Sequence, residues 1–179
     1  DDNFMNMLPE DIASRIVWEE IEQEFGASEM MFIAFGKSGK SIFNKESFKT
    51  AWDLVELIEK SPHVDEVISI PTMNRMDSED GFLEVDNLQS ERVLSTNELN
   101  EIKIYLDKNP DVKSRVIGKS GDFMSMAVRP KDGNNVLAFT TDILAITDSL
   151  LSGYETHYAG NSYITGVVPQ IVQNDISLL

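Results

Sequence analysis

The chain has 179 residues, with 31 acidic and 15 basic side chains, no cysteine and a formal net charge of −16. This charge argues against a nucleic-acid-binding protein, which needs clustered Lys and Arg, and against attraction to an anionic membrane surface. The lack of Cys excludes disulfides, thiol catalysis and Cys-based metal sites, while 41% hydrophobic residues are enough for a packed core.

The first part of the chain predicts a helical segment and then a β-α-β unit. Apolar residues at helical spacing predict a helix within residues 1–28. Residues 29–71 form the first half of the predicted fold, with buried-type strands at 30–35 and 64–70. The helix between these strands should begin after Asn44, which is a favourable N-cap residue.

The helix after Asn44 should bury one face against the two strands. Its apolar side chains recur at helical spacing, led by Phe48 and Trp52. We expect both aromatic rings to be buried.

Residues 72–112 are predicted to be a connecting segment that contains one helix. The stretch 72–94 is polar, with a weak strand at 82–85, and few buried contacts are expected to hold it. A capping box at 95–98 opens the helix, and the Asn-Pro pair at 109–110 should end it.

The second half, residues 113–161, is predicted as a ββαβ unit. It has strands at 114–117 and 123–128, a helix over 136–150 and a last strand at 154–159. With the first half, this predicts an α+β sandwich of ferredoxin-like arrangement, with the helices on one face of a mixed sheet.

Both ends of the chain suggest a domain excised from a longer protein. Residue 1 is Asp, and residues 162–179 are a predicted helix that stops without a C-terminal cap. No run reaches the roughly 20 consecutive apolar residues that a bilayer-spanning helix needs. We therefore expect residues 1–179 to form one domain whose two flanking helices continue into segments outside this sequence.

Residues 34–41 read AFGKSGKS and resemble a phosphate loop in which Ala34 replaces the first Gly. In a true phosphate loop, Lys40 would reach the phosphates and Ser41 would bind magnesium. The missing Gly restricts the tight turn, and the better N-cap at Asn44 would start the helix only after the Lys-Ser pair. A plain surface loop is the favoured interpretation, and a nucleotide-binding or hydrolysing domain is an alternative.

Other polar patterns predict no chemistry. The acidic turn at 76–81 lacks the spacing of a calcium-binding loop. His63 and His157 have no second ligand at helical spacing and are interpreted as ordinary polar residues. No catalytic, cofactor-binding or metal-binding residue is predicted, and the domain is not expected to be an enzyme.

Four methionines stand out because their flexible thioether side chains suit adaptable apolar surfaces. Met73 and Met76 follow a predicted strand, while Met124 and Met126 share one face of another. A place in the packed core is the favoured role, and contact with an apolar ligand is the alternative.

A series of short motifs resembles a known family of membrane proteins. They are Leu8–Asp11, Glu24–Gly26, Ser41–Asn44, the strand motif Ser61–Ile70, Phe82–Val85 and Ala159–Ser162. In this order they resemble the segment that follows the first membrane helix in exporters of the resistance–nodulation–division superfamily, especially its MMPL-type branch. The basic loop at 36–41 and the acidic stretch at 72–81 depart from that pattern.

The resemblance implies a porter-type domain on the periplasmic side of the bacterial inner membrane, with the first periplasmic loop favoured over the second. Such a domain forms part of the substrate path of a proton-driven exporter, and hydrophobic or lipid-like substrates are typical of this branch. Its partners would be the substrate, the transmembrane domain and the second periplasmic loop of the same polypeptide, and a homo-oligomer is an open alternative. Met73, Met76, Met124 and Met126 are then candidates for the substrate path. A stand-alone ligand-binding or adaptor domain is a further alternative.

Overall fold

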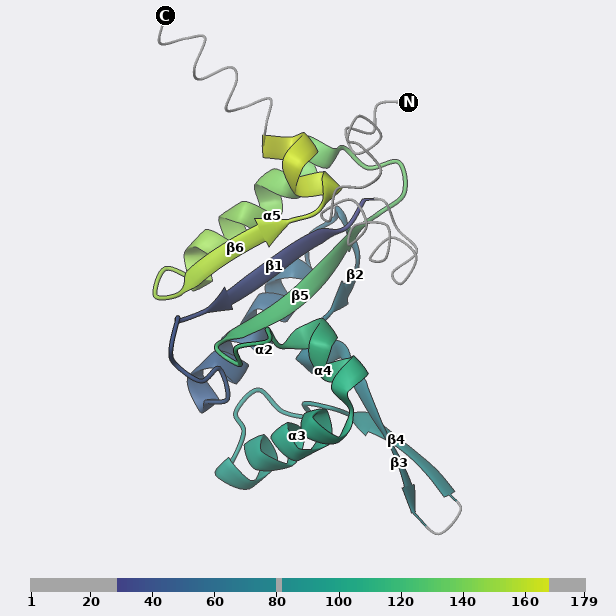
Figure 1. Cartoon of the computed structure of the whole chain (residues 1–179). Coiled ribbons are helices and arrows are strands. Elements are labelled where there is room, and N and C mark those ends of the chain that lie inside the picture. Colours follow the sequence, from purple (N-terminus) through teal and green to yellow (C-terminus); the bar gives the residue numbers. More distant parts are fainter. Residues whose placement is uncertain (1–28, 80–81, 168–179) are drawn as a thin grey trace, which may run out of the picture.

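The computed structural model describes residues 29–79 and 82–167, which form an α+β fold (Figure 1). One four-stranded sheet has the order β2-β5-β1-β6, and two long helices, α2 and α5, cover it. The elements of this sandwich are β1 Met31–Gly36, α2 Lys45–Ile58, β2 Val64–Ile68, β5 Phe123–Pro130, α5 Val136–Leu150 and β6 Glu155–Ala159.

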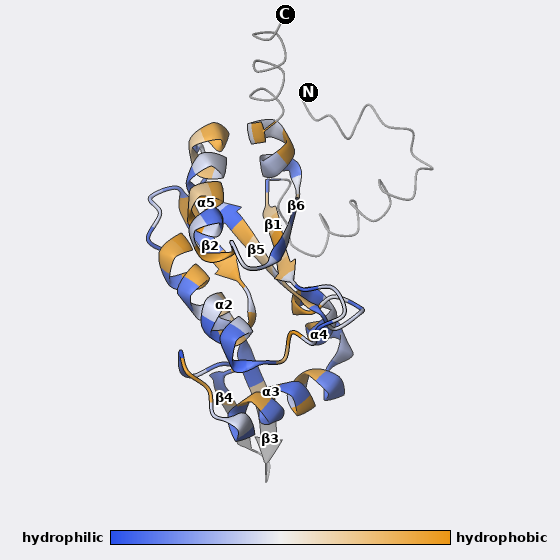
Figure 2. Cartoon of the chain, turned by 90° about the vertical axis from the view of Figure 1, so that its left-hand side faces the viewer, coloured by the Kyte–Doolittle hydropathy of each residue, from blue (hydrophilic) through white to orange (hydrophobic). Residues whose placement is uncertain are grey.

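The topology is that of two interlocked β-α-β units, as in ferredoxin-like folds. Strand β1 lies between β5 and β6, and β5 also pairs with the edge strand β2. Helix α2 connects β1 to β2, and α5 connects β5 to β6. Since such crossovers are right-handed, both helices come to lie on the same face of the sheet (Figure 2).

The predicted α+β class and the helices on one face are confirmed. The prediction of a mixed sheet is wrong, because every neighbouring pair is antiparallel. The first and third strands of the order β2-β5-β1-β6 do run parallel to each other, but β5 separates them. Sequence patterns identify strands, and they do not say which strands become neighbours.

Helix α2 begins where predicted, because the Asn44 side chain accepts a hydrogen bond from the Ser47 N–H at 2.9 Å. Phe48 is fully buried in the core, as expected. Trp52 is only half-buried, so its predicted burial against the sheet is wrong. The helix instead turns Ala51, Leu54, Val55 and Ile58 inward, which places Trp52 at the margin of the buried stripe.

A large insertion between β2 and β5 lies at one end of the sandwich (Figure 1). It consists of the short 3-10 helix η2 (Ile70–Thr72), the hairpin β3 (Asn74–Glu79) and β4 (Phe82–Asn87), and the helices α3 (Thr96–Lys108) and α4 (Pro110–Val116). The weak strand predicted at 82–85 is part of β4. Its partner β3 was not predicted, because that strand is polar and only the antiparallel pairing with β4 reveals it.

The strand predicted at 114–117 is wrong, because these residues end helix α4. Helix α3 ends at Lys108, as the Asn-Pro pair predicts, and Pro110 occupies the first turn of a second helix, α4, where its missing N–H costs nothing. Only Ile117 pairs with β5, through an isolated bridge to Met124. The second half is therefore a β-α-β unit, without the first strand of the expected ββαβ unit.

The insertion shares the hydrophobic core of the sandwich. Leu88, Leu94 and Leu106 are buried in the same cluster as the side chains of α2. The Gln89 amide is fully buried and donates to the Phe48 carbonyl at 3.3 Å. The expectation that few buried contacts hold residues 72–94 is therefore wrong for residues 88–94.

Two predicted segments cannot be assessed in this fold. The helix expected within residues 1–28 lies outside the described residues, as does most of the helix expected at 162–179, of which residues 161–167 are helical. Among residues 29–79 and 82–167, no helix combines the length and apolar character needed to cross a bilayer.

Two leucines of α2 test the register of this helix. Leu54 is fully buried, so Leu54→Ala should lower the free energy of unfolding by about 2–5 kcal/mol through the cavity that it leaves. Leu57 is 39% exposed, and Leu57→Ala should cost about 1 kcal/mol or less. Urea unfolding of both variants measures the difference. Equal losses would contradict the orientation of α2.

Candidate functional site

The entry to β1 and the exit from β6 meet at one end of the sandwich (Figure 1). The hydroxyl of Ser162, which is 2% exposed, donates a hydrogen bond to the Glu29 carbonyl just before β1. The buried Thr140 hydroxyl of α5 donates to the Ser162 carbonyl at 3.0 Å. One serine thus links the incoming chain, the outgoing chain and α5, and we name this contact the joint (Glu29, Met30, Thr140, Gly160, Ser162 and Gly166).

Two glycines allow the close packing of the joint. Gly160 has a φ of +99°, and a Cβ at this position would overlap the Met30 carbonyl. Gly166 lies in the helical stretch 161–167, where a Cβ would overlap the Thr140 side chain. A larger residue at either glycine would have to separate the outgoing chain from β1 or from α5.

A half-buried tyrosine continues the joint along α5. Tyr158 on β6 stacks on Tyr163, with ring centroids 5.2 Å apart, and its hydroxyl lies 2.7 Å from the Thr147 hydroxyl. Burial raises the pKa of Tyr158, because the phenolate form would lose its hydration. The outgoing segment is therefore tied to α5 at Thr140 and at Thr147.

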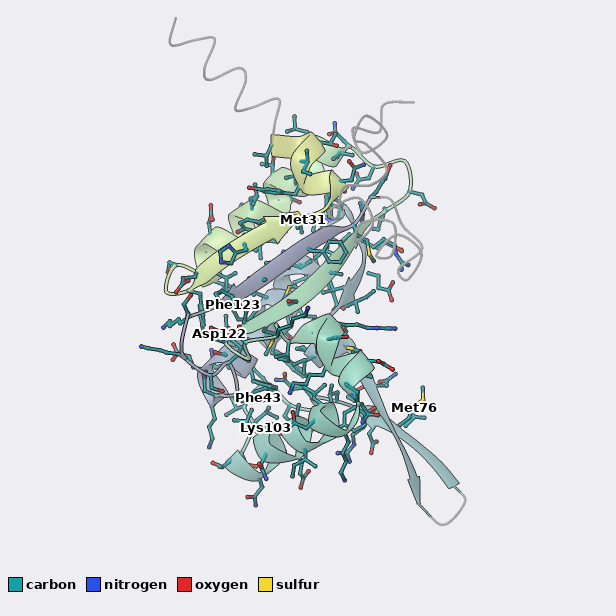
Figure 3. All side chains as sticks on the ribbon, in the orientation of Figure 1. Met31, Phe43, Met76, Lys103, Asp122 and Phe123 are labelled. Carbon is teal, nitrogen blue, oxygen red and sulfur yellow. The ribbon has the colours of Figure 1, made fainter. Side chains whose placement is uncertain are left out.

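At the opposite end of the sheet, the turn after β1 is held by two carboxylates. The Glu155 carboxylate accepts hydrogen bonds from the Ser38 N–H at 2.9 Å and from the Ser38 hydroxyl at 2.7 Å. Asp122, labelled in Figure 3, accepts from the Gly39 N–H at 3.0 Å. We call these contacts the carboxylate clamp (Ser38, Gly39, Asp122 and Glu155). The clamp joins the loops that precede β5 and β6 to the loop that follows β1.

The carboxylate clamp weighs against the phosphate-loop hypothesis for residues 34–41. Phosphate binding needs loop N–H groups that are free to donate, yet the amides of Ser38 and Gly39 already donate to anions. The turn closes tightly, with the Lys40 N–H bonded to the Lys37 carbonyl at 2.9 Å. Helix α2 begins at Lys45, so its N-terminus does not lie next to the Lys-Ser pair as in a nucleotide site.

Both clamp carboxyl groups favour their charged form. The Ser38 hydroxyl and then the Ser38 N–H lower the pKa of Glu155, because both donate to the ionised group. The Ser120 hydroxyl, followed by the Gly39 N–H, lowers the pKa of Asp122. The loop connection is therefore strongest when both groups are ionised.

The structure separates the four candidate methionines of the substrate path. Met124 and Met126 on β5 point into the core and are at most 1% exposed. Met73 is half-buried against the core, while Met76 is 63% exposed and points away from the body (Figure 3). Only the pair on the insertion is accessible to a ligand in this conformation.

No group of three or more His, Asp or Glu side chains within the described ranges could hold a metal ion. His63 lies 2.8 Å from the Asn134 side chain and stabilises the turn before β2. His157 packs against Phe123, with ring centroids 5.3 Å apart. His63 thus takes part in a hydrogen bond between two loops, and His157 in a ring contact.

Sequence reasoning did not find the joint or the carboxylate clamp. Gly160 and Ser162 belong to one of the motifs that resemble the exporter family, yet their partners Met30 and Thr140 are far away in the chain. A useful signal was the small residue Gly166 within an otherwise helical pattern, because a glycine there weakens the helix unless close packing requires it.

The joint predicts whether Gly166→Ala raises or lowers the stability of the domain. In an unconstrained helix, Gly→Ala stabilises by about 1 kcal/mol. We expect Gly166→Ala to destabilise instead, because the added methyl group overlaps Thr140. Gly153→Ala, in the turn after α5, is the control for steric overlap and should change stability little, since nothing lies within 4 Å of that Cβ position. Thermal unfolding measures both. A stabilised Gly166 variant would contradict the packing of this helix on α5.

The carboxylate clamp predicts a pH dependence. The folded pKa of Glu155 is below its ordinary value of 4.5, so its stabilising effect is complete above that pH and is lost as the pH falls through the folded pKa. Wild type should therefore be more stable than Glu155→Gln at pH 7, and the difference should vanish in acid. Urea unfolding at several pH values measures this. Glu101→Gln, outside the clamp, is the control, and a gap that stays constant with pH would refute the clamp.

A comparison with protein-family models finds no match for this chain, and a comparison with curated proteins finds none either. The resemblance to exporters therefore stays a prediction.

Proposed function

We propose that this chain is a porter-type periplasmic domain of a proton-driven exporter of the resistance–nodulation–division type. The observation that carries the proposal is the joint. The chain enters the folded unit at Glu29 and leaves it at Ser162, and these two residues are hydrogen-bonded to each other. A domain built in this way can be inserted between two consecutive membrane segments without disturbing either.

The joint would also let the domain move as one body with the segment that follows it. Thr140 and Gly166 hold the start of the outgoing helix on α5 without an intervening flexible linker. A displacement of that helix would reach the sheet through packed side chains, which transmit motion because packed interiors deform little. This is the mechanical role that a porter domain requires, and it needs no catalytic residue.

Exposed apolar side chains lie close to the joint. Leu137 is 47% exposed and stands one turn of α5 before Thr140, and Ile164 is 39% exposed. Large exposed apolar side chains that gather at one place favour contact with another apolar surface. In the proposed protein, this end of the domain faces the membrane and the transmembrane domain.

The insertion lies at the opposite end of the molecule (Figure 1). Its exposed Met76 pairs directly with Val85, which is 50% exposed. A two-stranded hairpin has little stability of its own, and contact with a partner would bury the exposed apolar pair on it. The second periplasmic loop of the same polypeptide is the partner that the proposal assigns to it, next to a hydrophobic or lipid-like substrate.

The proposal predicts the location of the domain in the full-length protein. Because the chain has no Cys, the exposed Ser152 can be changed to Cys as a single label in this domain. In spheroplasts, Ser152→Cys should react with a membrane-impermeant maleimide, while the unmodified domain should not.

Two results would defeat the proposal. Labelling of Ser152→Cys only after the membrane is permeabilised would place the domain in the cytoplasm. A native reading frame without an apolar segment of about 20 residues on each side of this chain would remove the membrane anchor points.

A further inference from the structure

A groove with a volume of ≈ 420 Å³ lies between α2, η2 and the end of β4. This volume is in the range of sites for small organic molecules. The side chains that line it come from three elements and include Trp52, Val55, Glu56, Glu59, Pro71 and Asn87.

The floor of the groove is apolar and contains an incompletely covered indole. Val55 is 5% exposed, and Pro71 and Trp52 are half-buried. Trp52 is the residue that helical spacing places in the core and the structure places at its margin. An indole face that borders a groove offers both apolar area and the negative side of a ring quadrupole.

The rim of the groove carries negative charge that the domain neutralises only in part. Trp52, Val55, Glu56 and Glu59 follow the i, i+3, i+4, i+7 spacing of one helix face. The neighbouring Asp53 is already paired, through Arg92 at 2.5 Å and Lys49 at 2.9 Å. By contrast, Glu59 forms no ion pair with a described residue, and the exposed Glu56 has only a longer-range attraction to Arg92, which is already bonded to Asp53.

From these contacts we propose that the groove binds a lipophilic organic cation, such as a quaternary ammonium or phosphonium compound. The apolar floor takes the body of the ligand, the Trp52 ring attracts its positive charge, and Glu56 and Glu59 supply charge complementarity. The net charge of −16 attracts any cation to the domain, and the groove provides the specific contacts. Binding itself does not depend on the proposed function; only the assignment of the cation as an exported substrate rests on it.

The test uses two probes of matched shape and opposite charge. Tetraphenylphosphonium and tetraphenylborate are titrated into the 179-residue chain that carries Trp18→Phe, so that Trp52 is the only indole. Trp52 fluorescence should change saturably with the cation and not with the anion, and calorimetry should give the same affinity. Saturable binding of both probes, or of neither, would overturn the proposal.

Charge-neutralising variants separate the groove from the overall charge. Glu56→Gln with Glu59→Gln should weaken binding of the cation by about tenfold, since each exposed charge contact contributes up to about fivefold. Asp132→Asn with Asp148→Asn makes the same change in net charge at exposed positions that do not line the groove, and should weaken binding by less than twofold. Equal losses in the two double variants would show non-specific attraction and would overturn the site.

A third variant examines the ring itself. Trp52→Leu keeps an apolar side chain and removes the indole face, so calorimetry should show several-fold weaker binding of the cation. Unchanged affinity would contradict the role of Trp52. These binding measurements are independent of the labelling of Ser152→Cys, so failure of the proposed exporter role and failure of the groove remain distinguishable.

Discussion

The structure depends on β1, one of the two strands that are hydrogen-bonded along both edges within the four-stranded sheet. Its register with β5 and β6 places Met31, Ile33 and Phe35 on one face, where all three are fully buried. Burying these side chains requires α2 and α5 to lie on that same face. Two right-handed crossovers, through α2 and through α5, place both helices on that face. The strand order β2-β5-β1-β6 is the one in which these two β-α-β units share a single sheet.

The two ends of this sandwich differ in how they are built. At the joint, Ser162 and two glycines bring backbone and side chains into direct contact, so the incoming and outgoing segments are held rigidly. At the opposite end, the long insertion is attached through side chains: Lys103 of α3 lies over the ring of Phe43 (Figure 3), and the Gln89 side chain donates to the Phe48 carbonyl. In the proposed exporter, the first end would transmit a displacement and the second would present surface to a partner.

Negative charge is distributed with two different consequences. In the carboxylate clamp, Asp122 and Glu155 are compensated by hydrogen bonds from the loop after β1 and stabilise the fold. At the Trp52 groove, Glu59 has no cationic partner among the described residues and Arg92 offsets the charge of Glu56 only in part, so both carboxylates are available to a ligand. Acidic side chains thus stabilise the fold where hydrogen-bond donors face them. In the proposed groove, where apolar side chains lie beside them, they contact a ligand.

The sequence by itself determined the local elements: the Asn44 and Ser95 caps start α2 and α3 where expected, because capping acts between residues three apart. It also determined the α+β class, through the alternation of strand and helix patterns. Only the tertiary structure decided the antiparallel neighbours, the helical state of α4 and the position of Trp52 outside the core, since packing overrides local preference. The joint and the groove could not be predicted for the same reason: their contacts join residues that are distant in the chain.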